Sequence, residues 1–206
     1  KQSFQRDILT NYIQGIILDL FKEKLNKRVG IAEFRSWKNS MMYMHNVLLD
    51  DEIPNDASIT VEYQIPQSSK RIDFIIAGQN EKKDDYAVLV ELKQWDKVQL
   101  TDKDAVVVTR FRHGDSEEPH PSYQAWSYAK LLQGFNETVY EENIQLKPCA
   151  YLHNYEEDDI INNSFYSDYI DKAPLFLRDD LMKLRKFIKE YVKHGDKTNI
   201  MYRIDN

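Results

Sequence analysis

The segment from Tyr86 to Leu92 constrains the fold of this chain more than any other segment. Its residues, Tyr-Ala-Val-Leu-Val-Glu-Leu, are apolar except for one glutamate. An apolar run of this length, without polar alternation, is typical of a central strand that is covered on both faces. We therefore expect a sheet with structure packed against both of its sides.

Two further strands are predicted just before this segment. Ser58 to Ile65 alternates between apolar and polar residues, which predicts that four side chains share one face: Ile59, Val61, Tyr63 and Ile65. Arg71 to Ala77 forms the second strand after a turn. A polar connection then leads to Tyr86, so the three strands follow one another closely.

Helices are predicted before and after these strands. Apolar residues recur every three to four positions from Phe4 to Asn26 and from Trp37 to Leu49, and both segments are expected to be helical. The same reasoning predicts helices at Ser122–Phe135 and Leu175–Lys193. The remaining expectations are strands at Ala105–Phe111 and Leu146–His153, a loop at Glu156–Ser164 and a strand-like end at Asn199–Asn206.

This order of elements predicts an α/β fold with a mixed central β-sheet flanked by helices. With 206 residues, one domain with appendages is expected. We expect the core in residues 1–155 and a helical C-terminal appendage in residues 156–206.

The composition excludes several classes of protein. No apolar run approaches the roughly 18 residues that cross a bilayer, and the N-terminus has no cleavage-site pattern, so no membrane association is expected. Cys149 is the only cysteine, which excludes an internal disulfide and a cysteine-based zinc site and fits the cytoplasm. The net charge of −6 argues against a broad basic surface that coats nucleic acid. It leaves a nuclease open, because a carboxylate-rich site is itself acidic.

Three charged residues occur among the most apolar predicted strands. Glu91 and Lys93 are two positions apart at the end of a strand, so their side chains leave the same face of the sheet. Asp73 lies on the preceding strand, and neighbouring strands are about 4.8 Å apart. The two carboxylates could share a Mg²⁺ ion, which would offset the cost of burying them. The alternative is a surface ion pair at a strand end.

The helix predicted at Ser122–Phe135 carries a second pair of polar residues. Gln124 and Tyr128 are four positions apart and therefore share one helical face. They could reach the space beside Glu91 and Lys93. Alternatively, Gln124 is solvated and Tyr128 is a half-buried core residue.

Taken together, these residues resemble the PD-(D/E)XK nucleases, particularly the RecB-like group. In that family an Arg-Ile-Asp-like strand, a Glu/Asp-x-Lys strand and a helix with Gln-x-x-x-Tyr occur in this order. Here the motifs are Arg71-Ile72-Asp73, Glu91-Leu92-Lys93, and Gln124 with Tyr128. The resemblance spans residues 33–155 and implies a restriction-endonuclease-like core.

A narrower resemblance concerns two short runs. Glu33-x-x-Ser36-Trp37 and Glu91-Leu92-Lys93-Gln94-Trp95 are similar to the N-terminal region of bacterial proteins that continue into a superfamily 1 helicase-like ATPase. This implies a helicase-like domain downstream in the same polypeptide. The 206 residues contain no Gly-x-x-x-x-Gly-Lys-Ser/Thr phosphate loop, so such a motor would lie outside them.

The resemblance implies a metal-dependent nuclease that hydrolyses phosphodiester bonds of nucleic acid, with DNA as the expected substrate. Asp73, Glu91 and the Leu92 carbonyl would bind Mg²⁺, for which Mn²⁺ can substitute. The ion would lower the pKa of a bound water, and Lys93 would position that water or stabilise the transition state. Gln124 and Tyr128 would orient the site or contact the nucleic-acid backbone. The alternative is a catalytically silent module that binds nucleic acid or a protein partner.

Further candidates follow from the same resemblance and from charge. Many family members carry another acidic residue on the first helix, for which Glu33 is the candidate and Glu62 the competitor. Glu33 could instead be a helix-start carboxylate that the helix dipole favours. Arg110 and Arg112 could grip phosphates of nucleic acid, or could belong to a solvated strand edge.

Overall fold

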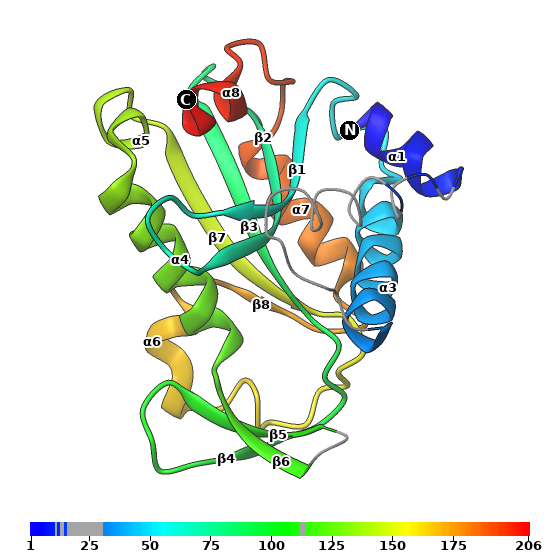
Figure 1. The fold of residues 1–206 in the computed structure, drawn as a ribbon, viewed down its shortest axis with the longest axis vertical. Helices are drawn as coiled ribbons and strands as arrows, with labels where there is room; N and C mark the ends of the chain where they lie inside the picture. Colours follow the sequence, from blue (N-terminus) through cyan, green and yellow to red (C-terminus); the bar gives the residue numbers. More distant parts are fainter. Residues whose placement is uncertain (11, 13–14, 16–30, 112–113) are drawn as a thin grey trace.

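The computed structural model describes residues 1–10, 12, 15, 31–111 and 114–206, without the side chains of residues 31–36. Its main sheet has the strand order β1-β2-β3-β7-β8 (Figure 1). These strands are β1 (Ser58–Gln64), β2 (Arg71–Gln79), β3 (Asp85–Lys93), β7 (Gln145–Leu152) and β8 (Leu175–Phe176). The pairs β1–β2 and β2–β3 are antiparallel, whereas β3–β7 and β7–β8 are parallel. The sheet is therefore mixed, as predicted.

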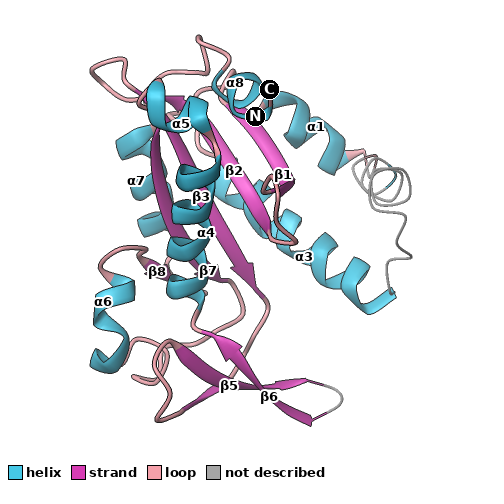
Figure 2. Cartoon of the chain, turned by 60° about the vertical axis from the view of Figure 1, so that its left-hand side comes forward, coloured by secondary structure: helices cyan, strands magenta, loops and turns pink. Residues whose placement is uncertain are grey.

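Helices cover both faces of this sheet (Figure 2). One face carries α1 (Gln2–Leu9), α3 (Ile31–Leu48) and α7 (Leu181–Tyr191). The other carries α4 (Pro121–Phe135), α5 (Glu137–Glu141) and α8 (Ile200–Asp205). A 3-10 turn (Ser164–Tyr166) and α6 (Ser167–Ile170) follow β7, and α6 lies against α4. The predicted α/β class is confirmed.

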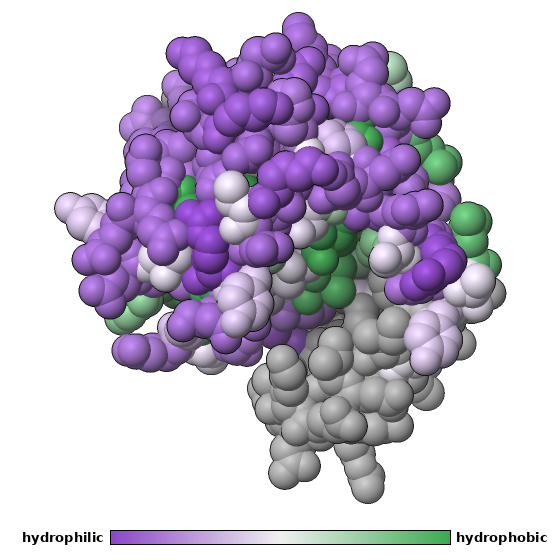
Figure 3. Space-filling model, turned by 90° about the horizontal axis from the view of Figure 1, so that it is seen from above, coloured by the Kyte–Doolittle hydropathy of each residue, from purple (hydrophilic) through white to green (hydrophobic). Residues whose placement is uncertain are grey.

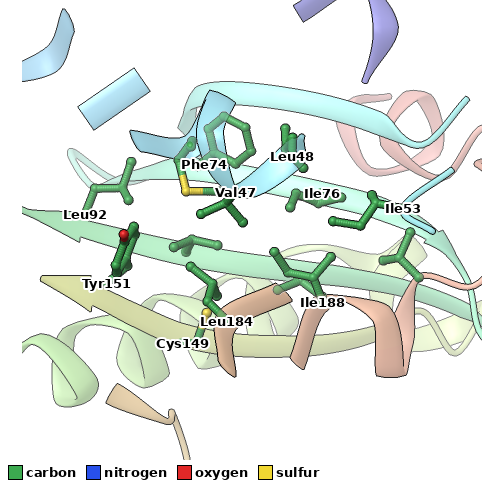
Figure 4. Close-up of a cluster of buried hydrophobic side chains, with 14 of the residues drawn as sticks. Val47, Leu48, Ile53, Phe74, Ile76, Leu92, Cys149, Tyr151, Leu184 and Ile188 are labelled. Atoms are coloured by element: carbon green, nitrogen blue, oxygen red, sulfur yellow. The ribbon is translucent and has the colours of Figure 1, made fainter. Parts of the chain in front are cut away.

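The two faces of β3 are buried in separate hydrophobic clusters. Val90 belongs to the cluster beneath α3 and α7. Figure 4 shows Phe74, Leu48 and Leu184 of the same cluster. Leu89 packs on the opposite face, toward α4. β3 is thus the doubly covered strand that its apolar run predicts.

A second, antiparallel sheet is inserted between β3 and α4. Its strands are β4 (Val98–Leu100), β5 (Val106–Phe111) and β6 (Gly114–Pro119), in the order β4-β5-β6. It projects beyond the end of the main sheet at which β3 finishes (Figure 2). A third cluster, which includes Val107, Tyr155 and Tyr166, packs this sheet against residues that follow β7. Only β5 corresponds to a predicted strand, because β6 is too polar to be recognised by hydrophobic alternation.

The side chains of β1 change face at Glu62. Ile59 and Val61 pack against the cluster beneath α3 and α7, whereas Tyr63 and Ile65 belong to the cluster beneath α4. The prediction that these four residues share one face is therefore wrong. Glu62 has a φ of 52°, which few residues other than glycine adopt, and this conformation reverses the alternation.

Two helix predictions need new limits. α3 begins at Ile31 rather than Trp37, because residues 31–36 contain no glycine or proline that would stop the helix earlier. The helix predicted at Phe4–Asn26 is confirmed only for α1. The rest of that prediction falls largely on residues 11, 13–14 and 16–30, which lie outside the described part of the chain.

The predictions for the C-terminal region are partly wrong. The helix predicted at Leu175–Lys193 is β8 followed by α7. The strand-like end is instead α8, whose first amide, that of Ile200, donates to the Asp196 carboxylate at 2.7 Å. Ile200, Met201 and Ile204 are buried whereas Tyr202 is exposed, a pattern that fits one face of a helix and not the alternation of a strand.

The expected appendage, residues 156–206, is integrated into the main fold. β8 extends the main sheet, and α7 contributes Leu184 and Ile188 to the same cluster as Phe74. α8 contributes Ile200 and Ile204 to the cluster on the other face. The proposed division at residue 155 therefore does not separate two hydrophobic cores.

The surface is polar where the molecule is seen from above (Figure 3). Hydrophilic residues dominate this view, as expected for a chain with 30% charged residues. No helix among the described residues is long and apolar enough to cross a membrane.

Replacement of Ile188 by alanine tests whether α7 belongs to the central core. Ile188 is fully buried, so Ile188→Ala should lower the free energy of unfolding by about 2–4 kcal/mol. Met182→Ala, on the exposed side of α7, should change it by less than about 0.5 kcal/mol. Urea unfolding monitored by circular dichroism measures both. An unchanged stability for Ile188→Ala would show that α7 is not part of the core.

Candidate active site

Five predicted site residues meet where β3 ends, on the face of the main sheet that α4 covers. Glu91 and Lys93 lie two positions apart on β3, so both point toward α4. Asp73 comes from the neighbouring strand β2. Gln124 and Tyr128 lie one turn apart on α4. The structure thus brings together residues from three elements, in agreement with the predicted order of motifs.

Gln124 connects the strand to the helix. Its amide oxygen accepts a hydrogen bond from Lys93 Nζ at 3.0 Å, and its amide nitrogen donates to Glu91 Oε1 at 2.7 Å. Lys93 Nζ also lies 2.8 Å from the same Glu91 oxygen. The Tyr128 hydroxyl is 3.3 Å from the Gln124 amide nitrogen. Lys93 and Glu91 are therefore held in place by each other and by α4.

Asp73 interacts with the main chain of β3. The paired residues of β2 and β3 stop at Phe74 and Val90, although both strands continue. Beyond this point the Leu92 amide donates to Asp73 Oδ2 at 2.8 Å, so the carboxylate replaces a backbone acceptor. The N–H and C=O of one strand residue point to the same side, so the Leu92 carbonyl is directed toward β2, the strand that carries Asp73.

Burial and mutual proximity shift the pKa values of the Asp73 and Glu91 carboxyl groups. Burial, followed by the Asp73 charge, raises the pKa of Glu91 to about 8, while Lys93 opposes the shift. Burial also raises the pKa of Asp73, against the effects of Lys93 and the Leu92 amide, and Glu91 is its hydrogen-bond partner. The pKa values of both carboxyl groups are therefore raised, because each is desolvated and lies beside the other.

Lys93 remains charged in this environment. Burial lowers the pKa of Lys93, but the Glu91 and Asp73 carboxylates raise it by more, so the net shift is upward. Its ammonium also lies 5.1 Å from the centre of the Trp95 ring, which adds a cation–π contact. This contact of Trp95 was not predicted. The feature of the sequence that could have indicated it is the position of Trp95 two residues after Lys93.

The oxygen donors of the site suit a hard divalent cation. Carboxylates and main-chain carbonyls are the ligands that Mg²⁺ prefers, and Asp73, Glu91 and Leu92 provide them. The described residues contain no group of three or more histidine, cysteine, aspartate or glutamate side chains placed to hold a metal. A metal bound here would therefore depend on two carboxylates, supplemented by main-chain and water oxygens.

Of the two candidates for a further acidic residue, the structure describes the side chain of Glu62 but not that of Glu33. Glu62 borders the site, because its charge contributes to the raised pKa of Glu91. Its carboxylate pairs with Arg71 at 3.2 Å. Glu33 lies in the first turn of α3, but its side chain is outside the described part of the chain. Glu33 therefore lies within the helix, although that helix was predicted to begin only at Trp37.

Of the two predicted phosphate-binding arginines, Arg110 belongs to the small sheet and not to this network. Arg110 is on β5 of the small sheet, where its side chain is 81% exposed and pairs with Asp115 at 3.1 Å. It is not among the residues that contact Glu91 or Lys93. Arg112 lies outside the described residues.

His120 has a structural role that the sequence did not reveal. It caps α4, since its Nδ1 accepts a hydrogen bond from the Ser122 amide at 3.2 Å, while Nε2 contacts the Ile161 carbonyl at 2.8 Å. Burial lowers the pKa of His120 to about 4, so the ring stays neutral and Nδ1 can accept. This cap fixes the start of α4, four residues before Gln124.

Comparisons with known proteins identify no relative. The sequence matches no family model and no curated protein, and the fold matches no solved structure. The resemblance of the motifs and the geometry of the site are thus the basis for a functional assignment.

Glu91→Gln should change how stability depends on pH in the absence of metal. The pKa of Glu91 is about 8 in the folded protein against an ordinary value of 4.5, so the folded form binds the proton more tightly. The stabilisation that protonated Glu91 contributes is complete below about pH 4.5 and is lost as the pH rises through about 8. Glu91→Gln should remove this loss and stabilise the protein at pH 8.5 by on the order of 2–4 kcal/mol.

Thermal unfolding in EDTA between pH 5 and pH 9 measures this effect. The matched control is Glu117→Gln, at an exposed position on β6. It should follow the parent at every pH. A Glu91→Gln protein with the same pH profile as the parent would contradict the raised pKa.

Proposed function

We propose that this chain is a metal-dependent nuclease that hydrolyses phosphodiester bonds of nucleic acid, with DNA as the expected substrate. The observation that carries the proposal is the convergence of Asp73, Glu91, Lys93 and Gln124 on one partly buried network. Glu91 is buried and Asp73 is partly buried beside it, and two adjacent desolvated carboxyl groups destabilise a fold unless something compensates their charge. Carboxyl pairs with raised pKa values are typical of functional sites.

The position of each residue supports a distinct role. Asp73, Glu91 and the Leu92 carbonyl would hold Mg²⁺ or Mn²⁺. When bound, the ion lowers the pKa of a coordinated water and neutralises negative charge on the phosphate. Lys93 keeps its proton on Nζ, from which it can donate a hydrogen bond to the nucleophile or to the phosphate. Gln124 orients Lys93 and Glu91 relative to each other, and Tyr128 supports Gln124.

The family and the wider context are part of the proposal. An antiparallel hairpin, a strand with Glu-x-Lys, a helix and a parallel strand follow one another here, which supports a restriction-endonuclease-like core of the PD-(D/E)XK type. The helicase-like downstream domain rests on the runs that end in Ser36-Trp37 and Gln94-Trp95. A nuclease core and a downstream helicase-like domain would both place this chain in DNA metabolism.

A second function has its own support. Lys93 pairs directly with Glu91, and the described residues lack a three-carboxylate group for a metal. These two features favour a catalytically silent nuclease-like module that binds nucleic acid or a protein partner. Such a module would not need to release Glu91 from Lys93.

Substitution of the three charged residues tests the nuclease proposal. Asp73→Asn and Glu91→Gln preserve shape but remove a charged ligand, so cleavage of labelled DNA with Mg²⁺ or Mn²⁺ should fall by at least about a hundredfold. Lys93→Met should abolish cleavage to a similar extent but leave metal binding largely intact. The matched control is Lys97→Met, at an exposed position, which should cleave like the parent.

Cleavage assays and calorimetric metal titration on the same proteins separate the two functions. Single- and double-stranded DNA and RNA serve as substrates, with EDTA as the blank. Wild-type cleavage that survives Asp73→Asn would reject this site. A parent without metal-dependent cleavage, which binds nucleic acid as well as the three variants do, would establish the silent module instead.

A further inference from the structure

A groove lies on the side of α4 that faces away from the candidate active site. Each residue of a helix is rotated by about 100° from the one before, so Trp126 and Lys130 lie on the side opposite Gln124 and Tyr128. The groove has a volume of about 580 Å³ and runs between α4, α5 and the first half of β7. This volume is within the range of sites that bind small organic molecules.

The floor of the groove is apolar. Ala129 of α4, Val139 of α5, and Ile144 and Pro148 at β7 line it and are buried. β8 pairs only with the second half of β7, so among the described residues no strand covers the outer edge of the first half. The groove therefore offers an apolar surface beside an uncovered strand edge.

The charge of the groove differs from that of the rest of the chain. Its charged lining residues are Lys130 and Lys172, and its other polar lining residues include Gln133, Asn143 and Gln145. None of the described residues that line it is acidic, although the chain has 34 acidic residues and a net charge of −6. An anionic ligand is therefore favoured here over a cationic one.

Aromatic rings lie at the side of the groove. Trp126 is 6.0 Å from Tyr123 and 6.2 Å from Tyr169, measured between ring centroids, and all three rings are partly exposed. Lys172 Nζ lies 4.7 Å from the centre of the Trp126 ring. The Tyr169 hydroxyl donates to Asp104 at 2.8 Å, which fixes this ring. Flat rings beside lysines are the combination on which single-stranded nucleic acids bind.

We propose that this groove binds a nucleotide unit of a single-stranded nucleic acid, with its base against Trp126 and its phosphates at Lys130 and Lys172. The inference rests on the proposed function and extends it to the path of the substrate. Trp126, at one end of the groove, lies on the side of α4 opposite Gln124, and the diameter of a helix is about 10–12 Å. One extended strand can therefore reach both residues. A duplex is disfavoured, because its bases are already stacked on one another and cannot stack on Trp126.

Binding of a labelled oligodeoxythymidylate in EDTA tests the charged part of the groove without cleavage. The double variant Lys130→Glu/Lys172→Glu should bind roughly tenfold more weakly or worse. The slope of log affinity against log salt should fall by about 1.4, since each lost phosphate contact contributes about 0.7 for a single strand. Lys97→Glu/Lys186→Glu makes the same change of net charge at exposed positions away from the groove lining and should affect binding much less.

Two substitutions of Trp126 test the stacking. Trp126→Leu should weaken binding of the oligodeoxythymidylate roughly tenfold, whereas Trp126→Phe keeps a ring and should bind nearly as the parent does. Circular dichroism of every variant checks that it folds. The inference is overturned if the parent fails to bind the oligonucleotide, or if the lysine and Trp126→Leu variants bind as well as the parent.

The outcome for the groove is distinguishable from the outcome for the nuclease. A parent that cleaves DNA, with unchanged oligonucleotide binding in the groove variants, rejects the groove alone. If the parent binds the oligonucleotide without cleaving DNA, and Lys130→Glu/Lys172→Glu weakens that binding, the groove is supported and the nuclease is rejected.

Discussion

The contact of Lys93 with Glu91 is the interaction on which the candidate site depends. Glu91 occupies an almost wholly apolar strand, and a carboxylate there would be strongly destabilising without a partner. Lys93 supplies the opposite charge from the same strand, and Gln124 satisfies both groups from α4. The position of α4 on the sheet is thus coupled to the chemistry of β3.

The sequence predicted the central part of the molecule well because local pattern and tertiary environment agree there. The apolar run of β3 can only be a covered strand, and the i, i+2 spacing of Glu91 and Lys93 fixes their common face. The i, i+4 spacing of Gln124 and Tyr128 works in the same way on α4. No knowledge of distant contacts was needed for these assignments.

Other parts could not be predicted because tertiary contacts decide them. The face change in β1 depends on the left-handed conformation of Glu62, which its residue type does not signal. β6 is polar and forms a strand only because β5 pairs with it. The ending of the β2–β3 pairing at Phe74, which turns Asp73 into a backbone acceptor, likewise has no signature in the sequence.

The small sheet leaves the main fold just after Lys93 and returns at His120, where α4 begins. Both ends are anchored independently, one by the pairing of β3 with β7 and the other by the His120 cap and the Gln124 contacts. The intervening 26 residues, 94–119, therefore do not set the distance between strand and helix. This region can therefore vary in length or content while the strand and helix that carry the candidate site keep their relative position.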